Sequence, residues 1–242
     1  MLSVFIKPRN RNRSRRPAGR AGLLLALVLA SQATLASPLG QTLQTLAPDA
    51  DGHVLSMAAE ALRCASYHGE PDAHALAVID YSMPSTAKRL WVFDLDEPAL
   101  LFNERVAHGS ATGDNKATFF SNKPGSHASS IGLYRTANSY YGSKGYALRL
   151  KGLEEGVNDN AYKRAIVMHG ADYATPSFVH RIGRLGRSWG CPAVRPGVVK
   201  PLINSIKDGQ YLFAYYPKPD WIDDSEYLNC PVSHDAQARN AP

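Results

Sequence analysis

The sequence predicts a mainly β domain with a few flanking helices. About seven short stretches are apolar or alternate between apolar and polar residues, which is typical of strands. Few stretches have helical spacing, and the connections are long and rich in Gly, Ser and Asn. Strands that outnumber helices and are joined by such connections favour a mainly β architecture.

Residues 1–36 are predicted to be a signal peptide. A basic region without acidic residues comes first, and the apolar stretch 21–30 (AGLLLALVLA) is too short to span a bilayer comfortably. Cleavage after Ala33 or Ala36 is expected, although an uncleaved anchor stays open. The basic residues are Lys7, Arg9, Arg11, Arg13, Arg15, Arg16 and Arg20.

This segment predicts export to the periplasm or secretion. Arg15 and Arg16 form a twin-arginine pair, so the Tat route is possible. Removing the seven basic residues takes the formal net charge from +6 to −1. No basic face for nucleic acid is then expected, and no stable membrane span remains after signal removal.

The remaining residues, 37–242, suit one domain with a core of about 53–217. The polar stretch 37–52 is expected to be a loosely held lead-in. Residues 54–68 place Leu55, Ala58 and Leu62 on one stripe, which predicts a helix. Strands follow at 75–81, 89–94 and 100–106, the last two as a hairpin around Asp96-Glu97-Pro98.

The segment 107–132 has few apolar residues and predicts one wall of a substrate cleft, because such long loops are usually functional. Its His108 and His127 are expected at the surface. Further strands are predicted at 145–151, 165–169 and 210–216, with a helix over 196–207 and a polar tail over 218–242.

The stretch Arg187-Ser188-Trp189-Gly190-Cys191-Pro192 carries the candidate chemistry. Pro192 disfavours a helical Cys191, and Gly190 allows close approach to its N–H, so the thiol can project from a turn. The N–H groups of Gly190 and Cys191 are expected to be free for an oxyanion. His169 ends a strand upstream, and a histidine and a cysteine on nearby loops can form a nucleophile pair.

From His169-Gly170 to Ser188–Val194, the chain resembles the murein L,D-transpeptidase (YkuD-type) catalytic domain, in the branch whose motif reads Ser-Trp-Gly-Cys-Pro. The similarity extends back through 119–122 and 152–159 and forward to about Tyr216. The resemblance implies a β-sandwich-like sheet domain with flanking helices. It also implies acyl transfer between peptidoglycan stem peptides without a cofactor.

The resemblance also implies residue roles. Cys191 is the nucleophile, His169 is the base, and the carbonyl of Gly170 orients the imidazole. Backbone N–H groups of Trp189, Gly190 and Cys191 form the oxyanion hole. Ser188 is a candidate substrate-binding residue.

The commoner motif has a histidine and an arginine flanking the cysteine at positions that are Trp189 and Ala193 here. The roles of those side chains therefore do not transfer to this chain. Arg195 is a candidate for supplying the missing charge and binding substrate.

Rival functions remain open. Papain-like and NlpC-type peptidases are disfavoured because their cysteine precedes the histidine, whereas His169 precedes Cys191 here. Sortases are disfavoured because they need a more distant histidine and a downstream arginine on a strand. A non-catalytic peptidoglycan-binding module with an inert Cys191 is the alternative from another class. Carboxypeptidase activity could accompany transpeptidation. No metal site is expected, because the histidines lack metal-ligand spacing.

Three cysteines in an exported chain predict one disulfide and one free thiol. A catalytic Cys191 must stay reduced, which leaves Cys64 and Cys230 as the pair. The open alternative is that both are separate thiols.

Overall fold

The computed structural model describes residues 1–5 and 37–231. The chain divides into Met1–Leu35 and Ala36–Pro242, and the fold below is that of the second unit. The predicted signal peptide falls mostly, and the end of the tail wholly, outside the described residues, so the signal stays a prediction. Across the described ranges, no helix is long and apolar enough to cross a membrane.

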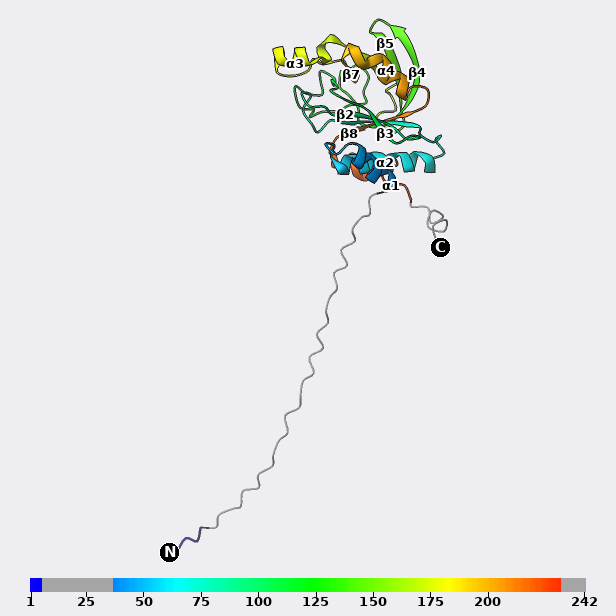
Figure 1. Cartoon of the computed structure of the whole chain (residues 1–242). Helices are drawn as coiled ribbons and strands as arrows, with labels where there is room; N and C mark the ends of the chain where they lie inside the picture. The colour runs from blue at the N-terminus through cyan, green and yellow to red at the C-terminus, as the bar shows by residue number, and fades with distance from the viewer. Residues whose placement is uncertain (6–36, 232–242) are drawn as a thin grey trace. The chain divides into compact units, whose positions relative to one another are not determined.

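The described residues contain helices and strands in a mixed order (Figure 1). The helices are α1 (Pro38–Leu46), α2 (Gly52–Tyr67), the 3-10 helix η1 (Asp172–Ala174), α3 (Pro176–Ile182), α4 (Pro196–Ile206) and α5 (Pro219–Asp224). The strands are β1 (Ala75–Asp80), β2 (Leu90–Asp94), β3 (Ala99–Glu104), β4 (Gly132–Gly142), β5 (Gly145–Gly152), β6 (Val167–Gly170), β7 (Ala193–Val194) and β8 (Tyr211–Tyr215).

The strands form one eight-stranded sheet in the order β3-β2-β1-β8-β4-β5-β6-β7. The pairs β1–β8 and β6–β7 are parallel, and the other pairs are antiparallel. Ala107, just after β3, bridges to Ala193 in β7 at the opposite edge of the sheet. The sheet is therefore nearly closed and barrel-like, and the mainly β class is confirmed.

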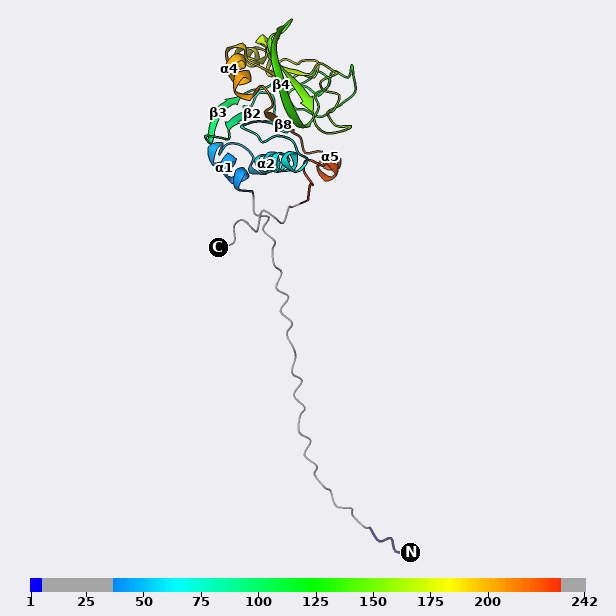
Figure 2. The same cartoon turned by 90° about the vertical axis from the view of Figure 1, so that its right-hand side faces the viewer.

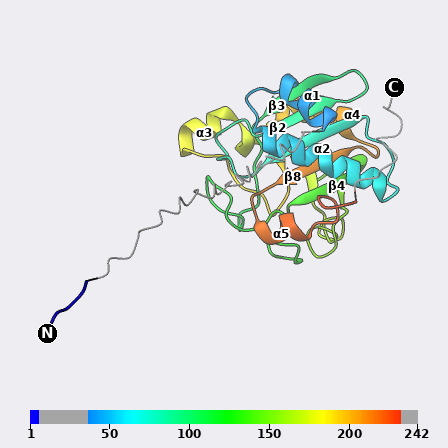
Figure 3. The ribbon, with the colours of Figure 1, turned by 90° about the horizontal axis from the view of Figure 1, so that it is seen from below.

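One face of the sheet packs on α1, α2 and α5 (Figures 1 and 2). Alternate residues of β1, Leu76 and Val78, point into this core and meet the apolar stripe of α2, including Leu55 and Leu62. A view from below shows α1 and α2 lying across the strands (Figure 3). The helix predicted over 54–68 is thus present and buries its stripe, as amphipathic helices do.

The other face of the sheet encloses a second core, covered by α4 (Figure 1). Ala77 and Ile79 of β1 point into it, together with Leu148 of β5 and Met168 of β6. Every residue of β1 is buried, because each of its two faces meets a core. This second core supports β6 and β7, which carry the candidate site.

Several local expectations were wrong. The lead-in over 37–52 contains α1, which begins at the Ser37 cap and buries Leu43. The strand β4 was not predicted, since polar residues interrupt its apolar pattern. The polar tail contains α5, whose Trp221 is buried.

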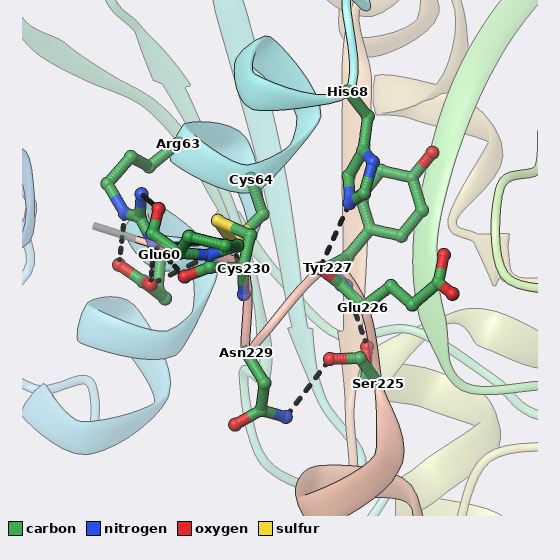
Figure 4. Close-up of polar contacts among 10 residues, drawn as sticks. Glu60, Arg63, Cys64, His68, Ser225, Glu226, Tyr227, Asn229 and Cys230 are labelled. Carbon is green, nitrogen blue, oxygen red and sulfur yellow. Dashed lines mark hydrogen bonds and ion pairs between the residues drawn. A yellow bond between two sulfur atoms is a disulfide. The ribbon is translucent and has the colours of Figure 1, made fainter. Parts of the chain in front are cut away.

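A disulfide joins Cys64 of α2 to Cys230 in the tail, with the Cα atoms 5.5 Å apart (Figure 4). Arg63 reinforces the junction by donating to the carbonyl oxygens of Cys230 and Pro231, at 2.9 and 3.0 Å. His68, one turn further along, contacts the carbonyl of Glu226 at 3.2 Å. The end of α2 is therefore fastened to the segment after α5 by covalent and polar links.

Candidate active site

Two short parallel strands bring the candidate nucleophile and base to one edge of the sheet. His169 in β6 pairs with Ala193 in β7, and its N–H donates to the carbonyl of Pro192 at 3.3 Å. Two residues earlier, the N–H of Val167 donates to the Sγ of Cys191 at 3.5 Å. The register thus places Cys191 beside the strand that carries His169, although the segment between them in the chain contains η1 and α3.

The turn before Cys191 is closed by Ser188. Its hydroxyl accepts the N–H of Gly190 at 3.1 Å and donates to the carbonyl of Cys191 at 2.7 Å. Gly190 has a φ of 115°, and a Cβ there would lie 2.7 Å from the carbonyl oxygen of Ala128. Only glycine suits this position, because L side chains avoid this conformation and the neighbouring backbone leaves no room.

The expectation that the Gly190 N–H is free was wrong, because Ser188 occupies it. In the described part of the chain, the N–H groups of Trp189 and Cys191 have no protein acceptor. Two of the three donors expected from the resemblance therefore remain available to an oxyanion, in a turn that is already fixed.

The imidazole of His169 is buried and held by its neighbour. Its Nδ1 lies 3.0 Å from the carbonyl oxygen of Gly170. Because a carbonyl only accepts, Nδ1 carries the hydrogen, and the neutral ring is left with Nε2 as an acceptor. Burial lowers the pKa of His169, while the Gly170 carbonyl opposes that shift. The ring is consequently neutral near pH 7 and competent as a base.

The thiol of Cys191 rests in a half-buried position. Sγ accepts from Val167 N–H and lies 3.8 Å from the carbonyl oxygen of Ala165. Burial raises the pKa of Cys191, opposed by the Val167 N–H, Arg164 and Lys144. Within residues 37–231, Sγ forms no hydrogen bond to His169, so the close thiol–imidazole contact expected from the motif is not made.

Both candidate substrate-binding residues make hydrogen bonds within the protein. Ser188 is buried, and its hydroxyl serves the turn described above. Arg195 makes two hydrogen bonds to the carboxylate of Glu104, at 2.7 and 3.0 Å. Its charge is therefore paired within the fold, and a substrate-binding role for either side chain stays a prediction.

The loop predicted as a cleft wall does flank the cysteine turn. Ser110 N–H donates to the carbonyl of Ser188 at 2.8 Å, and Ser129 Oγ donates to that of Gly190 at 3.0 Å. The surface location expected for His108 was wrong. It is buried with Nδ1 2.7 Å from a guanidinium nitrogen of Arg89, and burial lowers its pKa to about 4.

Trp189 and His127 form an exposed aromatic pair beside the nucleophile. Their rings stack with centroids 4.7 Å apart and planes 7° apart. Trp189 is 75% exposed, although Ser188 and Gly190 on either side are buried. Its indole is therefore not core packing, and its outer face is available for contact with a ligand.

Sequence reasoning missed Arg164 and Tyr173, which both interact electrostatically with Cys191. Arg164 ends a polar connection and donates to four groups of the 121–130 segment. Tyr173 lies edge-on to His169, with ring centroids 6.5 Å apart. No local sequence pattern identifies either residue, because each comes close to the site only when the chain folds.

In the described ranges, one group of side chains has the composition of a metal site: Glu60, Cys64 and Cys230. The disulfide uses both of its sulfurs. A disulfide sulfur is not a thiolate ligand, so this group does not fit a metal ion in its present state.

The chain matches one protein family and resembles several solved structures. The model of the L,D-transpeptidase catalytic domain family matches residues 46–215. Curated proteins give no match. Similar solved structures include an L,D-transpeptidase from Mycobacterium smegmatis, with 14% identity, 60% of each chain covered and a TM-score of 0.38.

Two further solved structures show the same range of likeness. An L,D-transpeptidase from Stackebrandtia nassauensis has 13% identity, covers 75% of this chain and 77% of its own, and has a TM-score of 0.36. Bd1075 from Bdellovibrio bacteriovorus has 18% identity, coverage of 59% and 48%, and a TM-score of 0.37. The chain spans about 60% of the length of the Mycobacterium smegmatis protein.

Proposed function

This chain belongs to the L,D-transpeptidase catalytic domain family, and on that premise we propose that it is a cysteine acyl-transferase acting on peptidoglycan stem peptides. The observation that carries the proposal is the placement of Cys191 beside the His169 strand, with an imidazole whose free nitrogen can accept a proton. A neutral base next to a cysteine is the arrangement that activates a thiol nucleophile.

In the proposed reaction, the Cys191 thiol gives its proton to Nε2 of His169 as Sγ attacks the carbonyl carbon of the third stem residue. The bond to the terminal D-alanine breaks, and His169 returns the proton to the departing amine. An amine of a second stem then attacks the thioester carbonyl, the C–S bond breaks, and the proton lost by the amine returns to the Cys191 sulfur as the cross-link forms. Water in its place gives a carboxypeptidase product.

The N–H groups of Trp189 and Cys191 would stabilise the oxyanion of each tetrahedral intermediate. Both lack a protein acceptor in the described structure, and they lie on the turn that Ser188 closes. One such donor contributes about 3 kcal/mol to transition-state stabilisation. Gly190 contributes shape to this turn rather than a donor.

We also propose that the protein works outside the cytoplasm, in the periplasm or after secretion. The basic and apolar features of residues 1–36 support export. The Cys64–Cys230 disulfide supports the same conclusion, because such bonds persist in oxidising compartments.

Two features of the Cys191 thiol keep the rival function open to test. The resting thiol of Cys191 has no hydrogen bond to His169 in the described structure, and burial raises its pKa. Both features would also suit an inert thiol in a wall-binding module.

Mass spectrometry of muropeptides distinguishes the two functions. The purified mature protein is incubated with disaccharide tetrapeptides, with Cys191→Ala as the control. An enzyme releases D-alanine and forms cross-linked dimers or tripeptides only when Cys191 is present. A binding module leaves the muropeptides unchanged but still sediments with insoluble peptidoglycan.

A further inference from the structure

We propose that Arg164 is a positioning residue that supplies the positive charge facing the Cys191 thiolate during catalysis. The proposal rests on the function above and replaces Arg195, the residue to which the sequence pointed. Arg164 lies in a loop 27 positions before Cys191, and the fold brings its positive charge close to the cysteine turn.

The guanidinium of Arg164 is bonded only to neutral oxygens. Its Nη1 donates to the Ser121 carbonyl at 2.7 Å and the Ser130 hydroxyl at 2.6 Å. Its Nη2 donates to the Ala128 carbonyl at 2.6 Å and the Ser126 hydroxyl at 3.2 Å. No carboxylate of the described residues forms an ion pair with it. Its positive charge is therefore fixed in place but not neutralised.

Two arginines closer to Cys191 in the sequence differ in this respect. Arg195 is paired with Glu104, and Arg187 lies 2.8 Å from a carboxylate oxygen of Asp114. A paired guanidinium attracts a further anion much less, because its carboxylate partner repels that anion. Arg164 is thus better suited to stabilise a new negative charge at the cysteine.

The guanidinium also lies against the cysteine turn. A Cβ on Gly190 would be 3.3 Å from Nη2 of Arg164 and 2.7 Å from the Ala128 oxygen that Nη2 binds. Arg164 and the Ala128 carbonyl that it binds therefore pack against Gly190, the residue before the nucleophile. It is only partly exposed, so water screens its field less than at a free surface.

Other titratable groups act on the same thiol. Burial is the largest influence on the pKa of Cys191 and raises it, while Arg164 and Lys144 lower it. The hydroxyl groups of Tyr81 and Tyr173 also interact with Cys191, and their own pKa values are raised to about 12. Both tyrosines are neutral near pH 7, so among the described residues Arg164 and Lys144 are the charged groups that lower the pKa of Cys191.

The test measures the rate at which iodoacetamide alkylates Cys191 as a function of pH. Wild type, Arg164→Met, Arg164→Lys and Lys144→Met are compared, with Arg105→Met as the matched control because Arg105 donates to the backbone of Thr86. Arg164→Met should alkylate about threefold to tenfold more slowly at pH 7.5. Arg164→Lys should stay close to wild type.

The rate at high pH separates charge from structure. If Arg164 acts through its charge, the alkylation rate of Arg164→Met at high pH equals that of wild type. Only the midpoint of its rate–pH curve moves to higher pH. An unchanged midpoint with an unchanged plateau would overturn the proposal, as would a lowered plateau without a midpoint shift. A wild-type thiol that fails to alkylate at any pH would instead refute the proposed nucleophile.

A second measurement applies if Arg164→Met does not fold. Arg164→Gln keeps an amide donor for the oxygens of the 121–130 segment but removes the charge, whereas Arg164→Lys keeps the charge. Arg164→Gln should alkylate about threefold to tenfold more slowly than Arg164→Lys at pH 7.5. Equal rates for the two variants would overturn the proposal.

Discussion

The Nδ1 of His169 lies 3.0 Å from the carbonyl oxygen of Gly170, the next residue in the chain. This contact fixes the tautomer of the ring, so that Nε2 is the atom able to take the thiol proton. In the proposed reaction, the neutral ring is the active form of the base. The pH at which the ring becomes protonated should therefore set the acidic limit of activity.

Burial lowers the pKa of His169 below its usual range. Activity should be lost as the pH falls through this lowered pKa, so the acidic limb of kcat/KM should lie below the ordinary histidine range. His169→Asn should reduce kcat by about 10²–10⁴-fold. The measurement is a pH–rate profile on a stem tetrapeptide. An acidic limb at or above pH 6.5 would contradict the assignment.

Replacing Trp189 should affect binding more than stability. Because its indole is 75% exposed, Trp189→Ala should change the free energy of unfolding by less than about 0.5 kcal/mol. Loss of the aromatic face should raise KM about threefold to thirtyfold. Trp189→His should leave the ionisations of the pH–rate profile in place, and the appearance of a new one would show that this position handles protons.

Reduction of the Cys64–Cys230 disulfide should destabilise the domain. The bond spans 166 residues and fastens α2 to the segment after α5. Chain-entropy estimates for such a loop give up to about 5 kcal/mol. Denaturant unfolding of wild type and Cys64→Ala/Cys230→Ala measures the loss, with Cys191→Ala as the control. Non-reducing peptide maps that link Cys191 to either residue would contradict this pairing.

The buried carboxylate of Glu154 should be a strong determinant of stability. It accepts from Leu133 N–H at 2.6 Å, Trp221 Nε1 at 2.7 Å and Ser225 Oγ at 2.6 Å. Glu154→Gln places an amide donor against these donors and should cost about 1–3 kcal/mol. The neighbouring Glu155→Gln is the exposed control. Equal unfolding midpoints for the two variants would refute this role.

Much of the fold could be predicted from local patterns. The stripe of α2 was visible because its burial follows the helical period, and β1, β2 and β8 were visible as continuous apolar runs because nearly all of their residues are buried. The helix α1 was missed, although Ser37 and Pro38 carry its start signal. The strand β4 was missed because polar side chains such as Arg135 and Asn138 fall within it.

The candidate site was predictable only where its chemistry is local. Cys191, His169 and Gly170 stand in a recognisable motif. The partners of Arg195 and Arg164 belong to no local motif, because Glu104 lies 91 residues from Arg195 and Ser121 lies 43 residues from Arg164. The sequence therefore indicated a charged residue near the cysteine but could not tell which arginine is already paired.

In the proposed reaction, Cys191 forms a thioester with the stem peptide. This intermediate can be detected by intact-protein mass spectrometry after acid quenching, at early times with a disaccharide tetrapeptide. We expect an adduct equal to the substrate minus D-alanine, mapped to Cys191, removed by hydroxylamine and absent from Cys191→Ala. D-alanine release by Cys191→Ala at the wild-type rate, or an adduct on another residue, would contradict it.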